Sequence, residues 1–328
     1  MDFVEVKDFK EFNIDLKKIT RSTMHKKSFY NYPVSFDIET SSFEDNGQLR
    51  ATMYVWQMCF GDGDLVVVGR TWGEWLSFIH DMRKFFHLKN DLILVIYCHN
   101  LSYEFQWIQR YFEWEKIFAL DERVPLYART TFGVEFRCSY RLSGYKLETL
   151  AKNLTRHNIR KLVGDLDYKK VRHSKTPITT EEMKYNINDV LIVCAYISEC
   201  LEKADGNITK IPLTKTGYVR KACQLACYGS DHSAPQYYQY RKLMKKLTIE
   251  PKEYAHLKMA FAGGFTHANA FYVNQTLDDI TSQDFISSYP YVLFVNQFPW
   301  SKGELMHPTF SELVNNINTY AWVIDIEF

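Results

Sequence analysis

Two carboxylates stand two residues apart at the end of a predicted strand. Asp37 and Glu39 close the strand-like segment Val34–Glu39. Side chains two apart in a strand point to the same face, so both carboxylates can reach one metal ion. The pattern is short enough to arise by chance, and residues 325–327 repeat it. Only the first pair is followed by further acids at the ends of predicted strands and helices, as a metal site requires.

A third acid follows the next apolar segment. Leu92–Tyr97 is wholly apolar, which suits a central strand covered on both faces of a sheet. Asn100 and Glu104 come directly after it, and residues at the carboxyl end of such a strand usually face the site. Asn100 can bond a phosphate or sugar, and Glu104 can serve a metal. An asparagine turn followed by an acid at a helix start would also explain both residues.

A tyrosine and an aspartate lie four residues apart within a predicted helix. Tyr185 and Asp189 therefore share one helix face. Asp189 precedes the apolar residues 190–193, and its burial would be costly without a cation or partner. Tyrosine, with an unperturbed pKa near ~10, is a poor base at neutral pH. We expect Tyr185 to orient a water that a metal has acidified.

Taken in order, these acids and the tyrosine resemble the three exonuclease motifs of the DEDD nucleases, tyrosine subtype. The resemblance implies a ribonuclease H-like fold and two Mg²⁺ or Mn²⁺ ions, about 3.5–4 Å apart, that flank the scissile phosphate. The implied metal-binding acids are Asp37, Glu39, Glu104 and Asp189. The family usually has Asp where Glu104 stands, and the extra methylene fits a metal contact made through water.

The surrounding sequence resembles a narrower family, the protein-primed family B DNA polymerases of bacteriophages. The resemblance rests on residues 163–168, 178–182 and 185–189. That family has a lysine where Val163 stands, and Lys161 is the candidate replacement. Stacking of the DNA on Tyr103 would need no base-specific contact. The implied contacts to a single-stranded 3′ end are Thr40, Asn100, Tyr103, Lys161 and Tyr168.

Two later segments extend this resemblance. Residues 261–264 resemble the aromatic-x-Gly-Gly motif between exonuclease and polymerase domains, where Gly263 and Gly264 would let a template strand approach. Residues 284–290 resemble polymerase motif A, with Ser288 in place of the usual Leu. A strand ending at a proline would also explain that heptad. The resemblance assigns Asp284 to the catalytic metals, and Ser287 and Tyr289 to the incoming nucleotide.

Strands that alternate with helices must position these residues, which predicts an α/β fold around one sheet. A capping box at residues 179–182 predicts a helix to about Lys203. The polar segment Asp205–Lys210 predicts a boundary between an exonuclease domain, 1–207, and a partial α+β polymerase palm, 208–328. The other expected strands are 53–60, 65–68, 134–139, 280–285 and 320–328, and the other expected helices are near 75–86, 103–111 and 146–154.

Composition supports two folded domains and limits the other classes of protein. Of 328 residues, 46% are apolar and 16% aromatic, so disorder is not expected. The segment 141–175 has ten Lys or Arg and three acids, which indicates either phosphate contacts or a solvated basic face. Seven cysteines without a CxxC pair argue against a disulfide framework and a structural zinc site.

No segment resembles a signal peptide or is apolar for long enough to cross a bilayer. We therefore expect a soluble protein with no membrane partner, in the cytoplasm (that of the host cell if the protein is viral).

The sequence thus predicts the N-terminal part, or a split subunit, of a protein-primed DNA polymerase with proofreading activity. No Lys-x-x-x-Asn-Ser-x-Tyr-Gly helix and no Asp-Thr-Asp hairpin follow motif A, so either the chain is shortened or the polymerase is split. The implied partners are single-stranded and primer-template DNA, a priming terminal protein and, for a split enzyme, a second polypeptide.

Two alternatives stay open. A self-sufficient DEDD-type exonuclease acting on short single strands would have no use for residues 261–264 and 284–290. A non-catalytic DNA-binding subunit would have no use for Asp37, Glu39, Tyr185 and Asp189.

Overall fold

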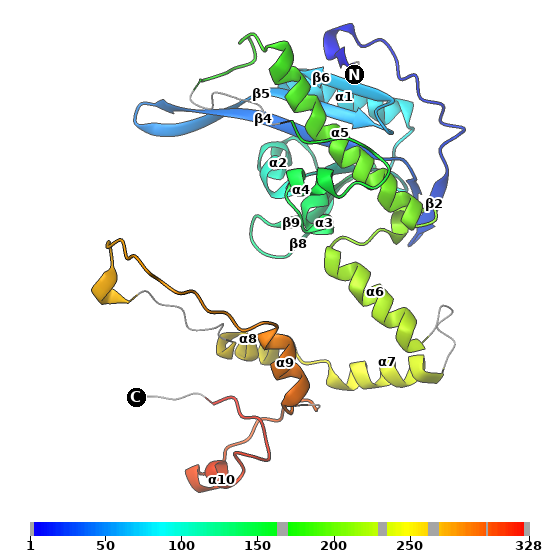
Figure 1. Cartoon of the computed structure of the whole chain (residues 1–328). Helices are drawn as coiled ribbons and strands as arrows, with labels where there is room; N and C mark the ends of the chain where they lie inside the picture. Colours follow the sequence, from blue (N-terminus) through cyan, green and yellow to red (C-terminus); the bar gives the residue numbers. More distant parts are fainter. Residues whose placement is uncertain (1–2, 163–169, 229–234, 262–268, 300, 325–328) are drawn as a thin grey trace. The chain divides into compact units, whose positions relative to one another are not determined.

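The computed structural model describes residues 3–162, 170–228, 235–261, 269–299 and 301–324. The chain divides into two compact units, Met1–Cys223 and Gln224–Phe328 (Figure 1). Ile208 and Ile211 lie beyond the expected boundary at residue 207, and both are buried in a core cluster of the first unit.

The first unit is built on one mixed sheet, in which the described residues form ten strands (Figure 1). Their order is β1-β6-β5-β4-β7-β10-β9-β8, and β3 pairs with both β2 and β7. β7 runs parallel to β4 and β10, whereas β5 is antiparallel to β4 and β6. The strands are β1 Val4–Glu5, β2 Arg21–Met24, β3 Lys27–Tyr30, β4 Val34–Asp45, β5 Gln48–Phe60, β6 Leu65–Gly69, β7 Leu92–Cys98, β8 Trp114–Ala119, β9 Pro125–Thr130 and β10 Val134–Cys138.

Helices cover both faces of this sheet. The helices of the unit are α1 Trp72–Phe85, α2 Leu101–Ile108, α3 Ser139–Ser143, α4 Leu147–Lys152 and α5 Thr180–Lys203, with short 3₁₀ turns η1 Val6–Asp8, η2 Gln109–Tyr111 and η3 Ile208–Lys210. Helix α6 Lys215–Tyr228 begins in the first unit and ends in the second. Alternate residues of β7 pack against opposite layers: Leu94 and Ile96 belong to the cluster that contains residues of α1 and α2, and Ile93 and Val95 to the cluster that contains residues of α5. This confirms the expected central strand covered on both sides.

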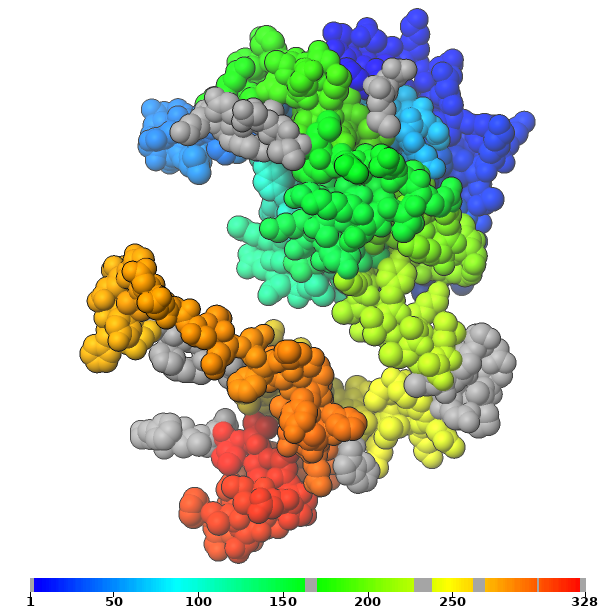
Figure 2. All heavy atoms as spheres, in the orientation of Figure 1, coloured from blue at the N-terminus to red at the C-terminus, as the bar shows by residue number. Residues whose placement is uncertain are grey.

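The β4–β5 hairpin carries the first two acids and extends beyond the core. Asn46 and Gly47 form its turn with φ angles of 51° and 75°, the left-handed values that a two-residue hairpin turn requires. The residues near this turn are mostly exposed, and this end of the hairpin stands out at the left of the first unit in Figure 2. The register between the strands shifts between Glu39 and Thr40, so a β-bulge lies directly beside the acids.

Helix α5 begins at the predicted capping box. Thr179 Oγ1 accepts from the Glu182 backbone N–H at 3.1 Å, and Glu182 Oε2 accepts from the Thr179 N–H at 2.9 Å. The helix ends at Lys203, as expected. Ser35 Oγ of β4 donates to the Val190 carbonyl oxygen at 2.7 Å, which ties the middle of the helix to the strand that carries Asp37.

The second unit is described by itself. Its elements are α7 Pro235–Leu247, α8 Pro251–Ala260, η4 Ala270–Tyr272, α9 Ser288–Val295 and α10 Phe310–Asn315. None of its described side chains is buried. The strands expected at 280–285 and 320–328 are not formed over 280–285 and 320–324, and residues 325–328 lie outside the described part. A strand needs a paired neighbour for its backbone groups, and the described part of this unit offers none.

Of the helices that the structure describes, none combines the length and the apolar character that a membrane span requires.

Candidate metal centre

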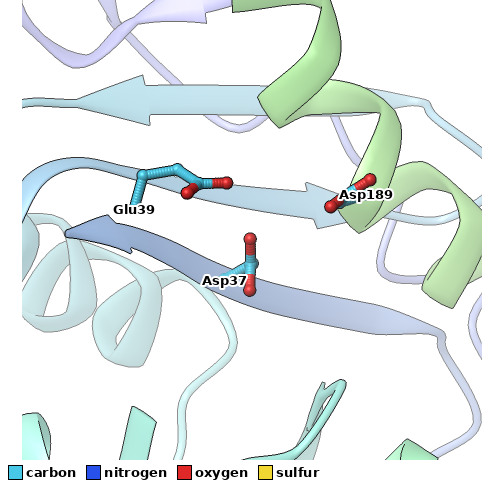
Figure 3. A group of neighbouring side chains, drawn as sticks. All are labelled: Asp37, Glu39 and Asp189. Carbon is cyan, nitrogen blue, oxygen red and sulfur yellow. The ribbon is translucent and has the colours of Figure 1, made fainter. Parts of the chain in front are cut away.

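Three acidic side chains meet between the sheet and helix α5 (Figure 3). Asp37 and Glu39 come from β4 and Asp189 from α5, and one carboxylate oxygen of each lies within 4.8 Å of the others. Asp37 and Glu39 are half-buried and Asp189 is 8% exposed. The strand alternation and the position of α5 therefore bring together residues that lie about 150 positions apart in the sequence.

The fourth acid lies beside Asp37. Glu104, on the first turn of α2, is 3% exposed. Burial, followed by the negative charge of Asp37, raises the pKa of Glu104 well above its usual value. Burial and the charges of Glu39 and Asp189 raise the pKa of Asp37 in the same way. Burial and Asp189 raise the pKa of Glu39 to about 7. Asp37 is thus repelled by each of the other three acids, and Asp189 also repels Glu39.

Several polar atoms of this site have no hydrogen-bond partner in the described part of the structure. They include Glu104 Oε2 and Asp189 Oδ1, both fully buried. Buried polar atoms are nearly always paired, and clustered buried anions are costly. Divalent cations of the Mg²⁺ type take carboxylate oxygens as ligands. The residues present therefore fit such an ion, which would satisfy these atoms and offset the repulsion.

A lysine of the loop before α5 contacts the site. Lys161 Nζ donates to Asp189 Oδ2 at 3.1 Å and lies 5.2 Å from the centre of the Tyr185 ring. Burial lowers the pKa of Lys161, but the charge of Asp189 outweighs this and raises the pKa above its ordinary value. Tyr185 is half-buried one turn before Asp189. The sequence predicted Lys161 as a DNA contact but did not predict its hydrogen bond to Asp189.

Three further predicted residues lie near the first acids. Thr40 follows Glu39 directly, and its hydroxyl is hydrogen-bonded to that of Tyr103. Tyr103 is 41% exposed, so part of its ring is open to a ligand. Asn100 precedes α2 with a left-handed φ of 85°, a conformation that asparagine adopts more readily than most residues. Asn100 is exposed and its side chain makes no capping bond to the helix.

Two structural contacts were not foreseen. Gln57 on β5 donates its Nε2–H to Asp37 Oδ2 at 2.8 Å. Arg172, counted in the basic segment, is 6% exposed and donates to Glu182 Oε1 through Nε and Nη2, at 3.1 and 2.6 Å. Its backbone N–H donates to Ser41 Oγ at 3.0 Å. Arg172 therefore holds the loop before α5 against β4 and does not face solvent as a phosphate contact would.

The remaining predicted residues either lie outside the described part of the chain or belong to the second unit. Tyr168, Gly263 and Gly264 lie outside the described residues. Asp284, Ser287 and Tyr289 belong to the second unit and are exposed, Tyr289 by 77%. Ser287 has a left-handed φ of 55° before α9. Among the described residues, Asp284 belongs to no group of three acidic, histidine or cysteine side chains that could hold a metal.

Comparison with known proteins shows the fold. No protein-family model matches the chain, and no curated protein matches it. Among solved structures, the chain is similar in fold to a DNA polymerase. It matches the phi29 DNA polymerase in an orthorhombic crystal form with a TM-score of 0.50 and 17% identity, over 74% of this chain and 41% of that one. The same polymerase in complex with primer-template DNA gives the same values.

At this identity the likeness establishes a polymerase-like fold and not an activity. The chain covers about two fifths of the length of the polymerase that it resembles.

Proposed function

We propose that this chain carries a metal-dependent 3′–5′ exonuclease, the proofreading part of a protein-primed family B DNA polymerase of bacteriophage type. The convergence of Asp37, Glu39 and Asp189 carries this proposal. The unpaired buried oxygens of Glu104 and Asp189 support a cation as the missing partner. The fold likeness to a DNA polymerase supports a polymerase origin.

The reaction is hydrolysis of the last phosphodiester bond of a DNA strand. A water oxygen bonds to the phosphorus, the bond from phosphorus to the 3′ oxygen of the preceding nucleotide breaks, and a nucleoside monophosphate leaves. Two Mg²⁺ or Mn²⁺ ions, held by Asp37, Glu39, Glu104 and Asp189, would lower the pKa of the water and stabilise the attacking and the leaving oxygen.

The other residues of the site bind and orient. Tyr185 lies on the face of α5 that carries Asp189, so its hydroxyl is suited to orient the attacking water. Lys161 supplies positive charge that attracts the phosphate. Tyr103 offers a partly exposed ring for stacking, next to Thr40. Asn100 offers an exposed amide to a sugar or phosphate, and Tyr168 would add a contact to the same strand.

The test is release of nucleotides from a 5′-labelled single-stranded DNA in Mg²⁺. We expect the wild-type chain to shorten the DNA from its 3′ end and the Asp37→Ala/Glu39→Ala variant to be inactive while still folded. The matched control is Asp121→Ala/Glu122→Ala, which removes two exposed acids from a loop. Undiminished cleavage by the first variant, or loss of activity in the control, would contradict the assignment.

We propose the polymerase role of the C-terminal part separately. Residues 1–207 would form the exonuclease domain and 208–328 the start of a palm. Gly263 and Gly264 would contact the template, Asp284 would bind the catalytic metals, and Ser287 and Tyr289 would hold the nucleotide. Support comes from the sequence motifs and from a fold likeness that covers 74% of the chain. Partners of this role are primer-template DNA, a priming terminal protein and, for a split polymerase, a second polypeptide that supplies the other polymerase residues.

A further inference from the structure

The carboxylate of Asp37 is held by one neutral side chain of the neighbouring strand. Gln57 lies directly opposite Asp37 in the antiparallel β4–β5 pair, and residues so paired point to the same face of the sheet. Its Nε2 lies 2.8 Å from Asp37 Oδ2. The Gln57 side chain is completely buried, so neither water nor a mobile surface group competes for this bond.

Gln57 alone can make this contact from β5. The residues on either side of it on the same face are Val55, opposite Glu39, and Cys59, opposite Ser35. Valine has no donor, and a thiol is a weak one. Gln57 Oε1 has no hydrogen-bond partner in the described part of the structure. A buried amide whose oxygen accepts no hydrogen bond is costly. Packing alone therefore does not explain a glutamine at this position.

A neutral amide is a better hydrogen-bond donor to a metal-binding carboxylate than a lysine or arginine side chain is. A hydrogen bond to Oδ2 fixes the rotation of the carboxylate plane and with it the direction of Oδ1. An amide donor is neutral, so Asp37 keeps its full negative charge for the ion. A lysine or arginine at this position would fix the carboxylate too, but its charge would weaken the attraction between Asp37 and a divalent cation.

We infer that Gln57 is a positioning residue that orients Asp37 for metal binding. The inference rests on the proposed metal-dependent nuclease. Side chains that bond to metal ligands typically change metal affinity or activity by roughly 10–100-fold when they are replaced. Gln57 acts through Asp37 and touches neither the DNA nor the reacting atoms.

The test measures metal binding directly. Free Mn²⁺ is followed by electron paramagnetic resonance during titration of the full chain, without DNA. Gln57→Met removes the donor at nearly constant size, and Gln57→Leu is a second variant of similar volume. We expect each to bind Mn²⁺ roughly 10–100-fold more weakly than the wild type. In the nuclease assay, the half-saturating Mg²⁺ concentration should rise by the same factor, with little change in the rate at saturating Mg²⁺.

The matched control is Cys59→Ala, which alters a buried side chain on the same face of β5, two residues away. It should change the melting temperature without changing Mn²⁺ affinity. Unchanged affinity in a folded Gln57 variant, or an equal loss in Cys59→Ala, would overturn the role of Gln57. A wild-type chain that binds no Mn²⁺ would instead overturn the proposed nuclease, so the two failures are distinct.

Discussion

Asp37 of the first unit and Asp284 of the second unit lie in opposite surroundings. Asp37 lies among three other acids, close to β5 and α5, and its charge is opposed by burial and by its neighbours. Asp284 is exposed and shares no metal-binding group with other described residues. We therefore expect Asp37 to take part in binding a cation and Asp284 to bind one only weakly in this chain.

The difference shows what a metal site requires beyond a carboxylate. In the first unit, β4, α2 and α5 lie far apart in the sequence and supply the acids, and the packing of the two helices against the sheet sets their spacing. In the second unit, the residues around Asp284 lack a buried framework, and the adjacent helix α9 leaves large apolar side chains such as Phe294 88% exposed. We expect substitutions in the first unit to alter activity strongly and the same change in the second to have almost no effect in this chain.

The largest effect in this comparison is expected at Glu104. Glu104→Gln keeps the shape of the side chain but removes a charge from the metal site, and should slow nucleotide release by roughly 10²–10³-fold. Glu104→Asp, the residue usual in the family, should be tolerated.

The same Glu104→Gln substitution should raise the melting temperature when metal is removed with a chelator. The buried side chain at position 104 then no longer opposes the charge of Asp37, and a gain of about 1 kcal/mol corresponds to about 2–4 °C for a unit of this size. Near-normal turnover, or a lower melting temperature in chelator, would show that Glu104 is not part of the charged cluster.

A smaller loss of activity is expected at Lys161. Lys161→Met should slow cleavage by roughly 10²-fold, because it removes the cation beside Asp189 while keeping a long side chain. The control is Lys152→Met, an exposed lysine that pairs with Glu148.

A second measurement on Lys161→Met tests its position without DNA. Burial and the charge of Lys161 together hold the pKa of His99 at about 4. Loss of that charge should raise the pKa of His99, as followed by the imidazole proton shifts in NMR. An unchanged His99 pKa would place Lys161 away from the site.

The sequence predicted the framework of the first unit better than its contacts. The apolar run of β7 and the capping box of α5 were confirmed, because both depend on local periodicity and local hydrogen bonds. Strand β4 continues past Glu39 to Asp45 through residues that are polar apart from Phe43 and have no apolar alternation. Their pairing depends on the turn at Asn46-Gly47.

The bond from Gln57 to Asp37 and the pairing of Lys161 with Asp189 depend on the tertiary fold, which spacing cannot encode. The strand predicted at 280–285 was wrong, because a short segment cannot form a strand without a neighbouring strand to pair with. The roles of the site residues remain predictions.

We expect Glu199 to stabilise the fold without taking part in the reaction. This carboxylate of α5 is buried and accepts from the backbone N–H groups of Thr155 and Arg156, at 2.8 and 2.9 Å, and from the Thr155 hydroxyl at 2.9 Å. Although burial opposes it, this set of donors lowers the pKa of Glu199 to about 2. Glu199 thus holds the start of the loop that carries Lys161.

Glu199→Gln should lower the free energy of unfolding by roughly 2 kcal/mol at pH 7. Because the folded-state pKa is below the unfolded one, near ~4.3, the wild-type advantage is complete above that value. It should shrink as the pH falls toward 2. Urea unfolding at several pH values measures the difference between the two proteins. A difference that stays constant from pH 7 to pH 3 would contradict the ionised state of Glu199.

The smallest effect is expected at Asp284. In this chain, Asp284→Ala should change neither the melting temperature nor the exonuclease rate, because the side chain is exposed and makes no metal cluster among the described residues. Nucleotidyl transfer by two metals needs more than one carboxylate at the ion pair, so we also expect no primer extension by the chain alone. The measurement is extension of a labelled primer-template with dNTPs and Mg²⁺, with and without a polypeptide carrying an Asp-Thr-Asp hairpin. Extension only on mixing, and its loss in Asp284→Ala, would establish that Asp284 completes a polymerase site with a partner. Extension by the chain alone would show that the second unit already holds a complete site, and would remove the contrast between the two acids.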